Sequence, residues 1–343
     1  MINFKLNHPS LLFCPQKTNM YYRKKHGRGF RYTDEKGKTI KDKKLKAWFH
    51  SLVIPPAWTE VEISDENSKE LLAVGRDAKG RKQYIYHPEY IKQRTKQKFD
   101  RIIEFARQLE KMRDITDQHL RKRKMNKEKV LATMVRLMDE AYFRPGNPYY
   151  TKENQSYGLT TLRSKHLEIT GNRMTFSYTG KSGQPQEHEI NDKKLATTIR
   201  DLDEIPGYRI FKYFDEEGEK HEVNSDELNE YIRGIMGKEF SAKDFRTWAG
   251  TLIAAVALDK LNTEEIEDDK NKEKNIRAAV EEVADRLGNT PAVAKSSYID
   301  PRIIAHYMDG KTIKNFQEKV KDLLLEMKNL SPTEACVLHM LEH

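Results

Sequence analysis

Residues 91–124 read IKQRTKQKFDRIIEFARQLEKMRDITDQHLRKRK, and they separate two kinds of hydrophobic pattern. Within them apolar residues recur at helical spacing among many basic ones, which is typical of a long amphipathic helix. Upstream, Gly and Pro interrupt short apolar runs, which is typical of strands and turns. We therefore predict an α+β chain, with a small β-rich domain over residues 1–92 and a larger, mainly α-helical domain over residues 93–343. The polar start of the helix, Ile91–Lys98, is the expected hinge between them.

The β-rich domain is predicted to consist of short strands and turns up to about residue 90. A turn is expected at Lys36-Gly37, and Pro55-Pro56 indicates a break between two apolar stretches rather than a helix. Residues 71–87 predict a hairpin, with a turn over Asp77–Gly80 and an alternating strand over Gln83–His87.

The larger domain is predicted to hold one small sheet among its helices. Three strands are expected at Leu167–Thr170, Met174–Tyr178 and Glu187–Ile190, joined by Gly-containing turns. Start and stop signals place a helix end near Arg144, a helix from the Ser241 capping box to about Lys260, a helix Asn275–Leu287 that stops at Gly288, a helix from Thr290 to Tyr298, and a final helix Asn315–Leu330.

The charge of the chain is unevenly distributed. The 343 residues contain 62 Lys+Arg and 53 Asp+Glu, a net charge of +9. Residues 1–150 hold 34 basic and 18 acidic residues, whereas residues 151–343 hold 28 and 35. This asymmetry favours a polyanionic partner that is bound mainly by the first part of the chain. A merely solubilising basic surface is the alternative that composition leaves open.

Several classes of protein are excluded at this stage. No apolar run approaches the ~18–20 residues of a membrane span, and the N-terminus resembles no signal peptide. Cys14 and Cys336 are too few for a disulfide framework and lack zinc-ligand spacing, so we expect a reducing, cytoplasmic location. The acidic clusters Asp215-Glu216-Glu217 and Asp268-Asp269 have no histidine nearby in the sequence pattern and are interpreted as solvated loops. We expect no bound metal.

Two basic stretches carry the remaining signals. Gly180-Lys181-Ser182 resembles the end of a nucleotide-binding loop, but Thr175 occupies the position of the first glycine and the context is a hairpin. We therefore expect no nucleotide cofactor. Residues 77–86, DAKGRKQYIY, interleave basic and aromatic residues, and Gln83 could read base edges in a major groove. Tyr84 and Tyr86 are expected to point to opposite faces of the strand. An ordinary basic turn that leads into a core strand remains the alternative.

Five motifs occur in an order that resembles the small type IB DNA topoisomerases of poxviruses and bacteria. They are Asp77–Tyr86, Arg144 with the following PGNPYYTKENQSYGL, Tyr178–Gly183 (YTGKSG), Lys243–Thr247 (KDFRT) and Leu287–Tyr298 (LGNTPAVAKSSY). The resemblance runs from about residue 20 to about residue 310. It implies a monomer that closes on double-stranded DNA as a C-shaped clamp, with no metal or ATP, and it is compatible with a place at the bacterial nucleoid.

The resemblance also assigns roles to residues. It places the nucleophile at Tyr298, the catalytic arginines at Arg144 and Arg246, and the general acid at Lys181. A fifth catalytic position, which is histidine in the poxvirus enzymes, is Asn289 here, as in the bacterial branch. Asparagine can donate a hydrogen bond to a phosphate but cannot shuttle a proton. The implied DNA contacts are Arg81, Lys82, Gln83, Tyr84, Tyr86, Tyr150 and Lys243.

Two other functions compete with this interpretation. Tyrosine recombinases share the catalytic constellation, but they usually carry H-x-L-R around the second arginine, where this chain has Lys243-x-x-Arg246. Their N-terminal domain is typically helical, whereas residues 1–90 are predicted to be β-rich. A non-catalytic DNA-binding module would keep the basic first half but has no use for four reactive residues in register. The sequence therefore predicts a type IB topoisomerase.

Overall fold

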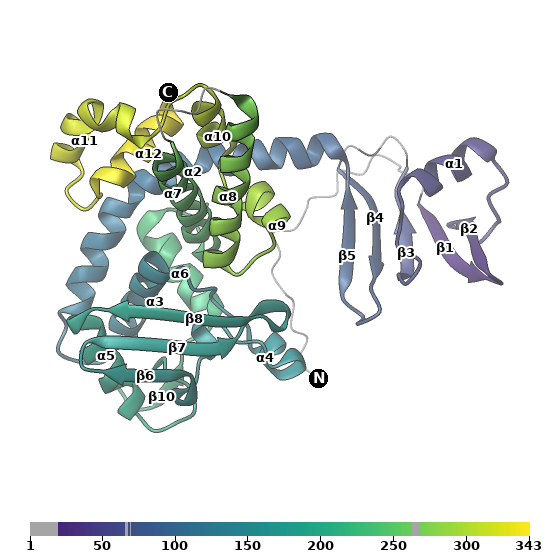
Figure 1. Cartoon of the computed structure of the whole chain (residues 1–343). Helices are drawn as coiled ribbons and strands as arrows, with labels where there is room; N and C mark the ends of the chain where they lie inside the picture. The colour runs from purple at the N-terminus through teal and green to yellow at the C-terminus, as the bar shows by residue number, and fades with distance from the viewer. Residues whose placement is uncertain (1–19, 66–67, 69, 263–267) are drawn as a thin grey trace. The chain divides into compact units, whose positions relative to one another are not determined.

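The computed structural model describes residues 20–65, 68, 70–262 and 268–343 (Figure 1). The chain divides into two compact units, Met1–Lys98 and Phe99–His343. The long helix predicted from about residue 91 is present as α2 (Pro88–Leu120). Because α2 is continuous, the expected hinge at Ile91–Lys98 lies within helical backbone. A domain boundary between residues 92 and 93 stays a prediction.

The first unit contains a five-stranded sheet in which all neighbouring strands are antiparallel, in the order β2-β1-β3-β4-β5. Its strands are β1 (Tyr21–His26), β2 (Gly29–Asp34), β3 (Thr59–Ile63), β4 (Leu71–Arg76) and β5 (Lys82–Tyr86). Helix α1 (Lys43–Ser51) packs the ring of Phe49 against the rings of Tyr21 and Tyr32, at centroid distances of 5.1 and 4.7 Å. The unit thus has a small core of its own.

Helix α1 corrects the expectation that residues up to about 90 form only strands and turns. Asp42 caps the helix by accepting hydrogen bonds from two backbone N–H groups. Phe49 is buried, and Leu45, Trp48 and Leu52 pack against the same core. These four apolar residues are spaced by one, three and four positions, which is the helical signal that the sequence analysis missed.

The hairpin predicted over residues 71–87 is confirmed as β4 and β5, with the turn at Asp77–Gly80. The expectation that Tyr84 and Tyr86 point to opposite faces is wrong, because residues two apart in a strand share a face. Their rings stack at 5.9 Å between centroids and 20° between planes. The ring of Tyr86 stacks in turn on that of Tyr90, at 5.5 Å.

The second unit holds the predicted three-stranded sheet. Its strands β6 (Leu167–Thr170), β7 (Arg173–Thr179) and β8 (Pro185–Asn191) are antiparallel in the order β6-β7-β8. A two-stranded sheet of β9 (Lys212–Phe214) and β10 (Lys220–Glu222) was not predicted.

Helices make up most of the second unit. After α2 they are α3 (Lys127–Ala141), α4 (Pro148–Asn154), α5 (Lys193–Glu204), α6 (Ser225–Met236), α7 (Ala242–Leu261), α8 (Asp269–Leu287), α9 (Pro291–Ser297), α10 (Pro301–Met308), α11 (Lys321–Glu326) and α12 (Pro332–Glu342). Short 3-10 turns are η1 (Leu159–Thr161), η2 (Ser164–His166), η3 (Lys181–Gly183) and η4 (Ile313–Val320). Within the part of the chain that the structure describes, no helix is both long and apolar enough to cross a membrane.

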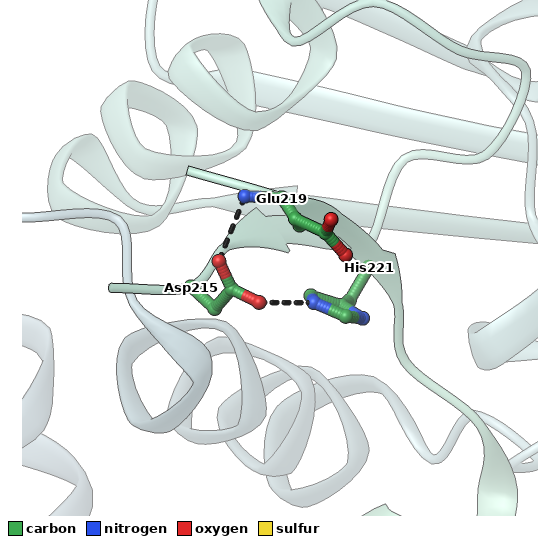
Figure 2. Close-up of side chains that lie close together, drawn as sticks. All are labelled: Asp215, Glu219 and His221. Carbon is green, nitrogen blue, oxygen red and sulfur yellow. Dashed lines mark hydrogen bonds and ion pairs between the residues drawn. The ribbon is translucent and has the colours of Figure 1, made fainter. Parts of the chain in front are cut away.

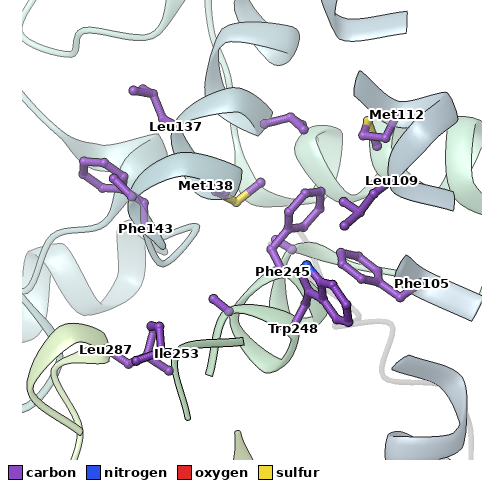
Figure 3. Packing of buried hydrophobic residues seen from close by; sticks show 14 of the residues in the cluster. Phe105, Leu109, Met112, Leu137, Met138, Phe143, Phe245, Trp248, Ile253 and Leu287 are labelled. Atoms are coloured by element: carbon purple, nitrogen blue, oxygen red, sulfur yellow. The ribbon is translucent and has the colours of Figure 1, made fainter. Parts of the chain in front are cut away.

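Helix α7 lies at the centre of the second unit's core. It is buried around most of its circumference and packs against α3, α6, α8, α10 and α12. The Phe245 ring meets the Phe105 ring of α2 edge-on at 4.9 Å, and Trp248 and Leu109 lie beside them (Figure 3). Because α7 is held on all sides, side chains on it are placed more rigidly than side chains on a loop.

The end of the chain differs from its prediction. Residues Asn315–Leu330 do not form one helix: η4 and α11 succeed each other, and a separate helix α12 follows. Ser331 and Glu334 form a capping box at the start of α12. The pair Asp268-Asp269, interpreted as a solvated loop, instead begins α8: Asp268 caps the helix and Asp269 is its first residue.

Candidate active site

Arg144 lies just after the end of α3. That helix ends three residues earlier than predicted, because Tyr142 adopts a left-handed conformation with φ 62°. The Nη2 atom of Arg144 donates hydrogen bonds to the carbonyl oxygens of Leu287 and Gly288, at 3.0 and 2.8 Å. It also donates to Oδ1 of Asn289 at 2.9 Å. The end of α3 is thereby joined to the loop that follows α8.

Arg246 lies on α7, where its side chain is only 3% exposed. The predicted capping box at the start of this helix is confirmed: Ser241 donates to Oδ2 of Asp244 from both its N–H and its hydroxyl, each at 2.9 Å. Nη1 of Arg246 donates to the carbonyl of Tyr142 at 2.6 Å and Nη2 to that of Leu287 at 2.7 Å. Its Nε has no hydrogen-bond partner among the described residues.

The carbonyl oxygen of Leu287 is the common anchor of the site. It accepts hydrogen bonds from Arg144, from Arg246 and, at 3.3 Å, from Nδ2 of Asn289. Gly288 ends α8 at the predicted place, with φ 57°, and this left-handed residue turns the chain so that Asn289 faces Arg144. Two guanidinium groups and one amide are therefore fixed around a single backbone atom.

Tyr298 ends helix α9 and is held against α7. A Cβ atom at Gly250 would lie 2.7 Å from both the Cβ and the carbonyl oxygen of Tyr298, so the absence of a side chain there permits the contact. The hydroxyl of Thr251 donates to the carbonyl of Tyr298 at 3.2 Å and accepts from the N–H of Asp300 at 3.1 Å. Gly250 lies one helical turn after Arg246, so both face the tyrosine from one helix.

The charges at the site act on one another. The guanidinium of Arg246 lies 5.2 Å from the centroid of the Tyr298 ring. Burial, and then the neighbouring charge of Arg144, lower the pKa of Arg246 to about 10. Burial raises the pKa of Tyr298, but Arg246, Arg144 and Lys243 together outweigh it, so the pKa of Tyr298 is lowered. The tyrosine is therefore easier to ionise than an exposed one.

Neither Arg144 nor Arg246 is paired with a carboxylate of a described residue; their partners are carbonyl and amide oxygens and, for Arg246, the side chain of Tyr298. The half-buried Arg113 behaves differently, whereas the buried Arg23 also donates to backbone carbonyls. Arg113 is ion-paired with Asp139 and Glu334, and that pairing raises its pKa. A buried and a half-buried cation with no carboxylate partner among the described residues favour the binding of an anion.

An aromatic layer supports these arginines from the sheet. The hydroxyl of Tyr178 on β7 lies 3.1 Å from Nε2 of His188 on β8, and the ring of Phe143 lies 4.2 Å from the His188 ring. Burial, and then the charge of Arg246, lower the pKa of His188 to about 4, so the imidazole is neutral near pH 7. Burial raises the pKa of Tyr178. This neutral layer adds no counter-charge to the site.

Comparison with known families shows which proteins this chain is similar to. The family described as eukaryotic DNA topoisomerase I, catalytic core, matches residues 81–327, and that described as bacterial DNA topoisomerase IB, N-terminal domain, matches residues 29–77. The DNA topoisomerase 1B of Acanthamoeba polyphaga mimivirus is 34% identical over 286 residues, which cover 81% of this chain and 84% of that protein. The chain belongs to the type IB DNA topoisomerases.

More distant viral relatives agree. The DNA topoisomerase I of Monkeypox virus and the DNA topoisomerase 1B of Vaccinia virus are each 25% identical over 276 residues, covering 78% of this chain and 82% of theirs. The predicted small type IB branch is confirmed, and the tyrosine recombinase alternative is not favoured. As a member of this family, the chain is an isomerase that acts on DNA.

Three residues predicted for this topoisomerase site lie outside the cluster of hydrogen bonds. Lys181 is exposed on the turn between β7 and β8, and its side chain makes no hydrogen bond or ion pair with a described residue. Lys243 is exposed in the first turn of α7, close enough to lower the pKa of Tyr298. Tyr150 is half-exposed on α4.

The other predicted DNA contacts lie in the first unit of the topoisomerase, on and just before β5. Lys82 and Tyr84 are exposed. The side chains of Arg81 and Gln83 are both hydrogen-bonded to Oδ2 of Asp77, at 2.8 and 2.9 Å. These bonds, with Arg81 as the largest cause, lower the pKa of Asp77 to about 2. Their contact with DNA stays a prediction.

One group of side chains in the topoisomerase has the donor atoms of a metal site: Asp215, Glu219 and His221 (Figure 2). The statement that the acidic turn has no histidine nearby is wrong, because Nε2 of His221 lies 2.5 Å from Oδ2 of Asp215. The other carboxylate oxygen of Asp215 accepts from the N–H of Glu219 at 2.7 Å. Asp215 is thus bonded to the His221 side chain and to the backbone of Glu219, which is sufficient to explain why the three residues lie close together.

Sequence reasoning missed several residues that build the site. Gly250 reads as a helix-weakening glycine, and its use is visible only when Tyr298 is placed against it. The anchoring carbonyl of Leu287 carries no side-chain signal at all. Thr251 and His188 are ordinary core residues in the sequence. A helical Gly four residues after Arg246 was the one feature that could have suggested a close approach.

Proposed function

We propose that this type IB topoisomerase relaxes supercoiled duplex DNA through transient cleavage of one strand by Tyr298. The phenolate oxygen of Tyr298 attacks a backbone phosphorus; a new P–O bond forms as the bond to the 5′ oxygen breaks. The products are a 3′-phosphotyrosyl enzyme and a free 5′-hydroxyl. After strand rotation, the 5′-hydroxyl attacks the phosphotyrosine and releases Tyr298. Because the ester conserves the bond, resealing requires no nucleotide.

The observation that carries this proposal is a tyrosine of lowered pKa beside the half-buried Arg144 and the buried Arg246, neither of which has a carboxylate partner in the part of the chain that the structure describes. In the transition state, negative charge increases on the non-bridging phosphate oxygens. The planar guanidinium groups of Arg144 and Arg246 can donate to those oxygens, and the buried Nε of Arg246 is a further donor, with no partner among the described residues. No metal ion is needed for this part of the chemistry.

The remaining roles concern protons and orientation. We assign the general acid to Lys181, which would pass a proton to the departing 5′ oxygen. Asn289 uses its Oδ1 to accept from Arg144, which leaves an N–H of its amide to donate to the phosphate. Asn289 therefore takes the orienting part of the histidine role but not a proton-transfer part.

The first unit is assigned to DNA binding. Lys82 and Arg81 would contact phosphates, while Gln83, Tyr84 and Tyr86 would lie along a groove. Tyr150 and Lys243 would contact DNA near the scissile phosphate. We propose that the two units close around the duplex as a C-shaped clamp, that a single chain suffices, and that the bacterial nucleoid is its place of action. Binding through phosphates should weaken steeply as salt rises.

The test uses negatively and positively supercoiled plasmid in EDTA without nucleotide. Relaxation of both, with a covalent protein–DNA adduct trapped by denaturant, is expected. Tyr298→Phe should abolish the adduct and leave duplex binding intact, whereas Tyr208→Phe, at an 84% exposed position, should cleave like the wild type. Persistent supercoils with the wild-type protein, or an adduct with Tyr298→Phe, would overturn the proposal.

A further inference from the structure

Gln186 lies between Arg144, the turn that carries Lys181 and the loop that carries Asn289. It is the second residue of β8 and is paired in register with Tyr178 of β7, at the base of the turn that carries Lys181. Its Nε2 donates to the carbonyl of Pro185 at 2.8 Å. Its Oε1 accepts from Nη1 of Arg144 at 3.4 Å. No role in the reaction assigned above uses this side chain.

Two glycines give the Gln186 side chain its space. A Cβ atom at Gly180 would lie 2.6 Å from Cγ of Gln186. A Cβ atom at Gly288 would lie 2.6 Å from both Nε2 and Oε1 of Gln186. Gly180 immediately precedes Lys181, and Gly288 immediately precedes Asn289. The glutamine therefore fills a slot between the backbone of the lysine turn and the backbone of the asparagine loop.

The backbone φ angles show that the two positions require glycine for different reasons. Gly288 has φ 57°, so its left-handed conformation at the end of α8 already favours glycine. Gly180 has φ −93°, which any residue adopts. What Gly180 avoids is therefore a collision with Gln186. The base of the lysine turn is thus held by the backbone bond from the N–H of Gly180 to the carbonyl of Gln184, at 2.7 Å, and by packing against the Gln186 side chain.

We infer that Gln186 is a positioning residue. It holds the turn that carries Lys181 in a fixed place relative to Arg144 and Asn289, which would bind the scissile phosphate. The inference rests on the proposed function, in which Lys181 is the general acid. The exposed lysine has no side-chain partner among the described residues, so its approach depends on the base of its turn. Arg144 depends less on Gln186, since its three other bonds, to Leu287, Gly288 and Asn289, are shorter, at 2.8–3.0 Å.

A change of leaving group in the substrate separates the placement of the general acid from the other steps of cleavage. An alkoxide must be protonated as it leaves, whereas a thiolate, whose conjugate thiol has a pKa of about 8.5, leaves without an acid. Replacing the bridging 5′ oxygen at the cleavage site by sulfur therefore removes the need for Lys181. It leaves the need for Arg144 and Arg246 unchanged, because charge still develops on the non-bridging oxygens.

The experiment measures single-turnover cleavage of duplex oligonucleotides that carry either oxygen or sulfur at this position. Gln186→Ala is expected to slow cleavage of the oxygen substrate by ~10–100-fold, and that of the sulfur substrate by less than about threefold, because the loss is one of acid placement. Gln184→Ala, an exposed residue of the same turn, is the matched control and should be near wild type on both. Equal slowing on both substrates, or none on either, would overturn the inference.

Two further variants separate the outcomes. Lys181→Ala should be slow with oxygen and near wild type with sulfur. If it stays slow with sulfur, the acid assignment is wrong, and the role of Gln186 fails with it. If Lys181→Ala is restored and Gln186→Ala is not, only the inference fails. Gly180→Ala should also slow oxygen cleavage, and adding Gln186→Ala should not slow it further, because the colliding Cγ is then gone.

Discussion

Replacing Gly250 by alanine is expected to slow DNA cleavage without preventing folding or DNA binding. The new Cβ would lie 2.7 Å from Cβ of Tyr298, about 0.7 Å less than the shortest ordinary contact of 3.4 Å. The opposing atom belongs to the backbone end of the tyrosine, so Tyr298 has to move away from α7 and from Arg246. A misplacement of ~1 Å can cost ~10²-fold in rate, so a 0.7 Å shift should cost some tens of fold.

The effect on stability should be small by comparison. Overpacking costs ~1–3 kcal/mol, and the gain of Ala over Gly within a helix offsets up to ~1 kcal/mol of it. The matched control is Gly234→Ala on α6, where an added Cβ meets nothing within 4 Å. That control should raise the melting temperature slightly and cleave at the wild-type rate.

The assay is the rate of covalent adduct formation in a single turnover, measured beside the melting temperature and the affinity for duplex DNA. For Gly250→Ala we expect slower adduct formation with nearly unchanged affinity. Wild-type cleavage by this variant would refute the reasoning, since it would mean that Tyr298 need not lie against α7. A loss of DNA affinity equal to the loss of rate would also contradict it.

Two further predictions concern charge. Because Arg246 helps to lower the pKa of Tyr298, the rate of cleavage by the wild type should rise with pH and level off below pH 10. The Arg246→Ala variant should lose ~10²–10³-fold in rate, and its rate should level off at a higher pH. A pH–rate profile measures both, and an unshifted profile of the variant would contradict the assignment. Glu334→Gln should destabilise the fold by about 1–3 kcal/mol, measured by chemical unfolding, because Arg113 loses one of its two carboxylates and keeps Asp139. Burial raises the pKa of Glu334, but the neighbouring Arg113 outweighs burial and the pKa is lowered. The ion pair therefore stabilises the fold above pH 4.5, and this stabilisation is lost as the pH falls below that value. The Glu334→Gln variant should lack this loss of stability in acid, and a pH dependence identical to that of the wild type would count against the Arg113–Glu334 pair.

Local signals predicted much of the fold because they act within a few residues. Each of these signals satisfies the backbone groups of one helix end. The structure contains the capping box of Ser241 and Asp244, the helix stop at Gly288 and the helix start at Thr290-Pro291. Helix α1 was missed because the Pro-Pro break beside it drew the interpretation toward strands. The predicted final helix is instead the 3-10 turn η4, which ends at Val320, and the short helix α11, which ends at Glu326; Ser331 then caps the separate helix α12.

The site was harder to predict because its contacts join distant parts of the chain. The bonds of Arg144 reach the loop after α8, 143 residues or more away. Tyr298 is one of 16 tyrosines, and only the resemblance singled it out. Neither spacing nor composition indicates that Gly250 and the carbonyl of Leu287 hold the reacting groups in place. Lys181 was predicted from its motif, but its place beside the phosphate remains a proposal.

The shared carbonyl of Leu287 has a consequence for how this site can vary over time. Every amino acid supplies the same main-chain oxygen, so substitution at position 287 can change packing but cannot delete the acceptor. Alanine scanning would therefore record no loss of this acceptor, although two arginines depend on it. During evolution the buried side chain of residue 287 could be replaced by others of similar volume, while the carbonyl that accepts from Arg144 and Arg246 stayed the same.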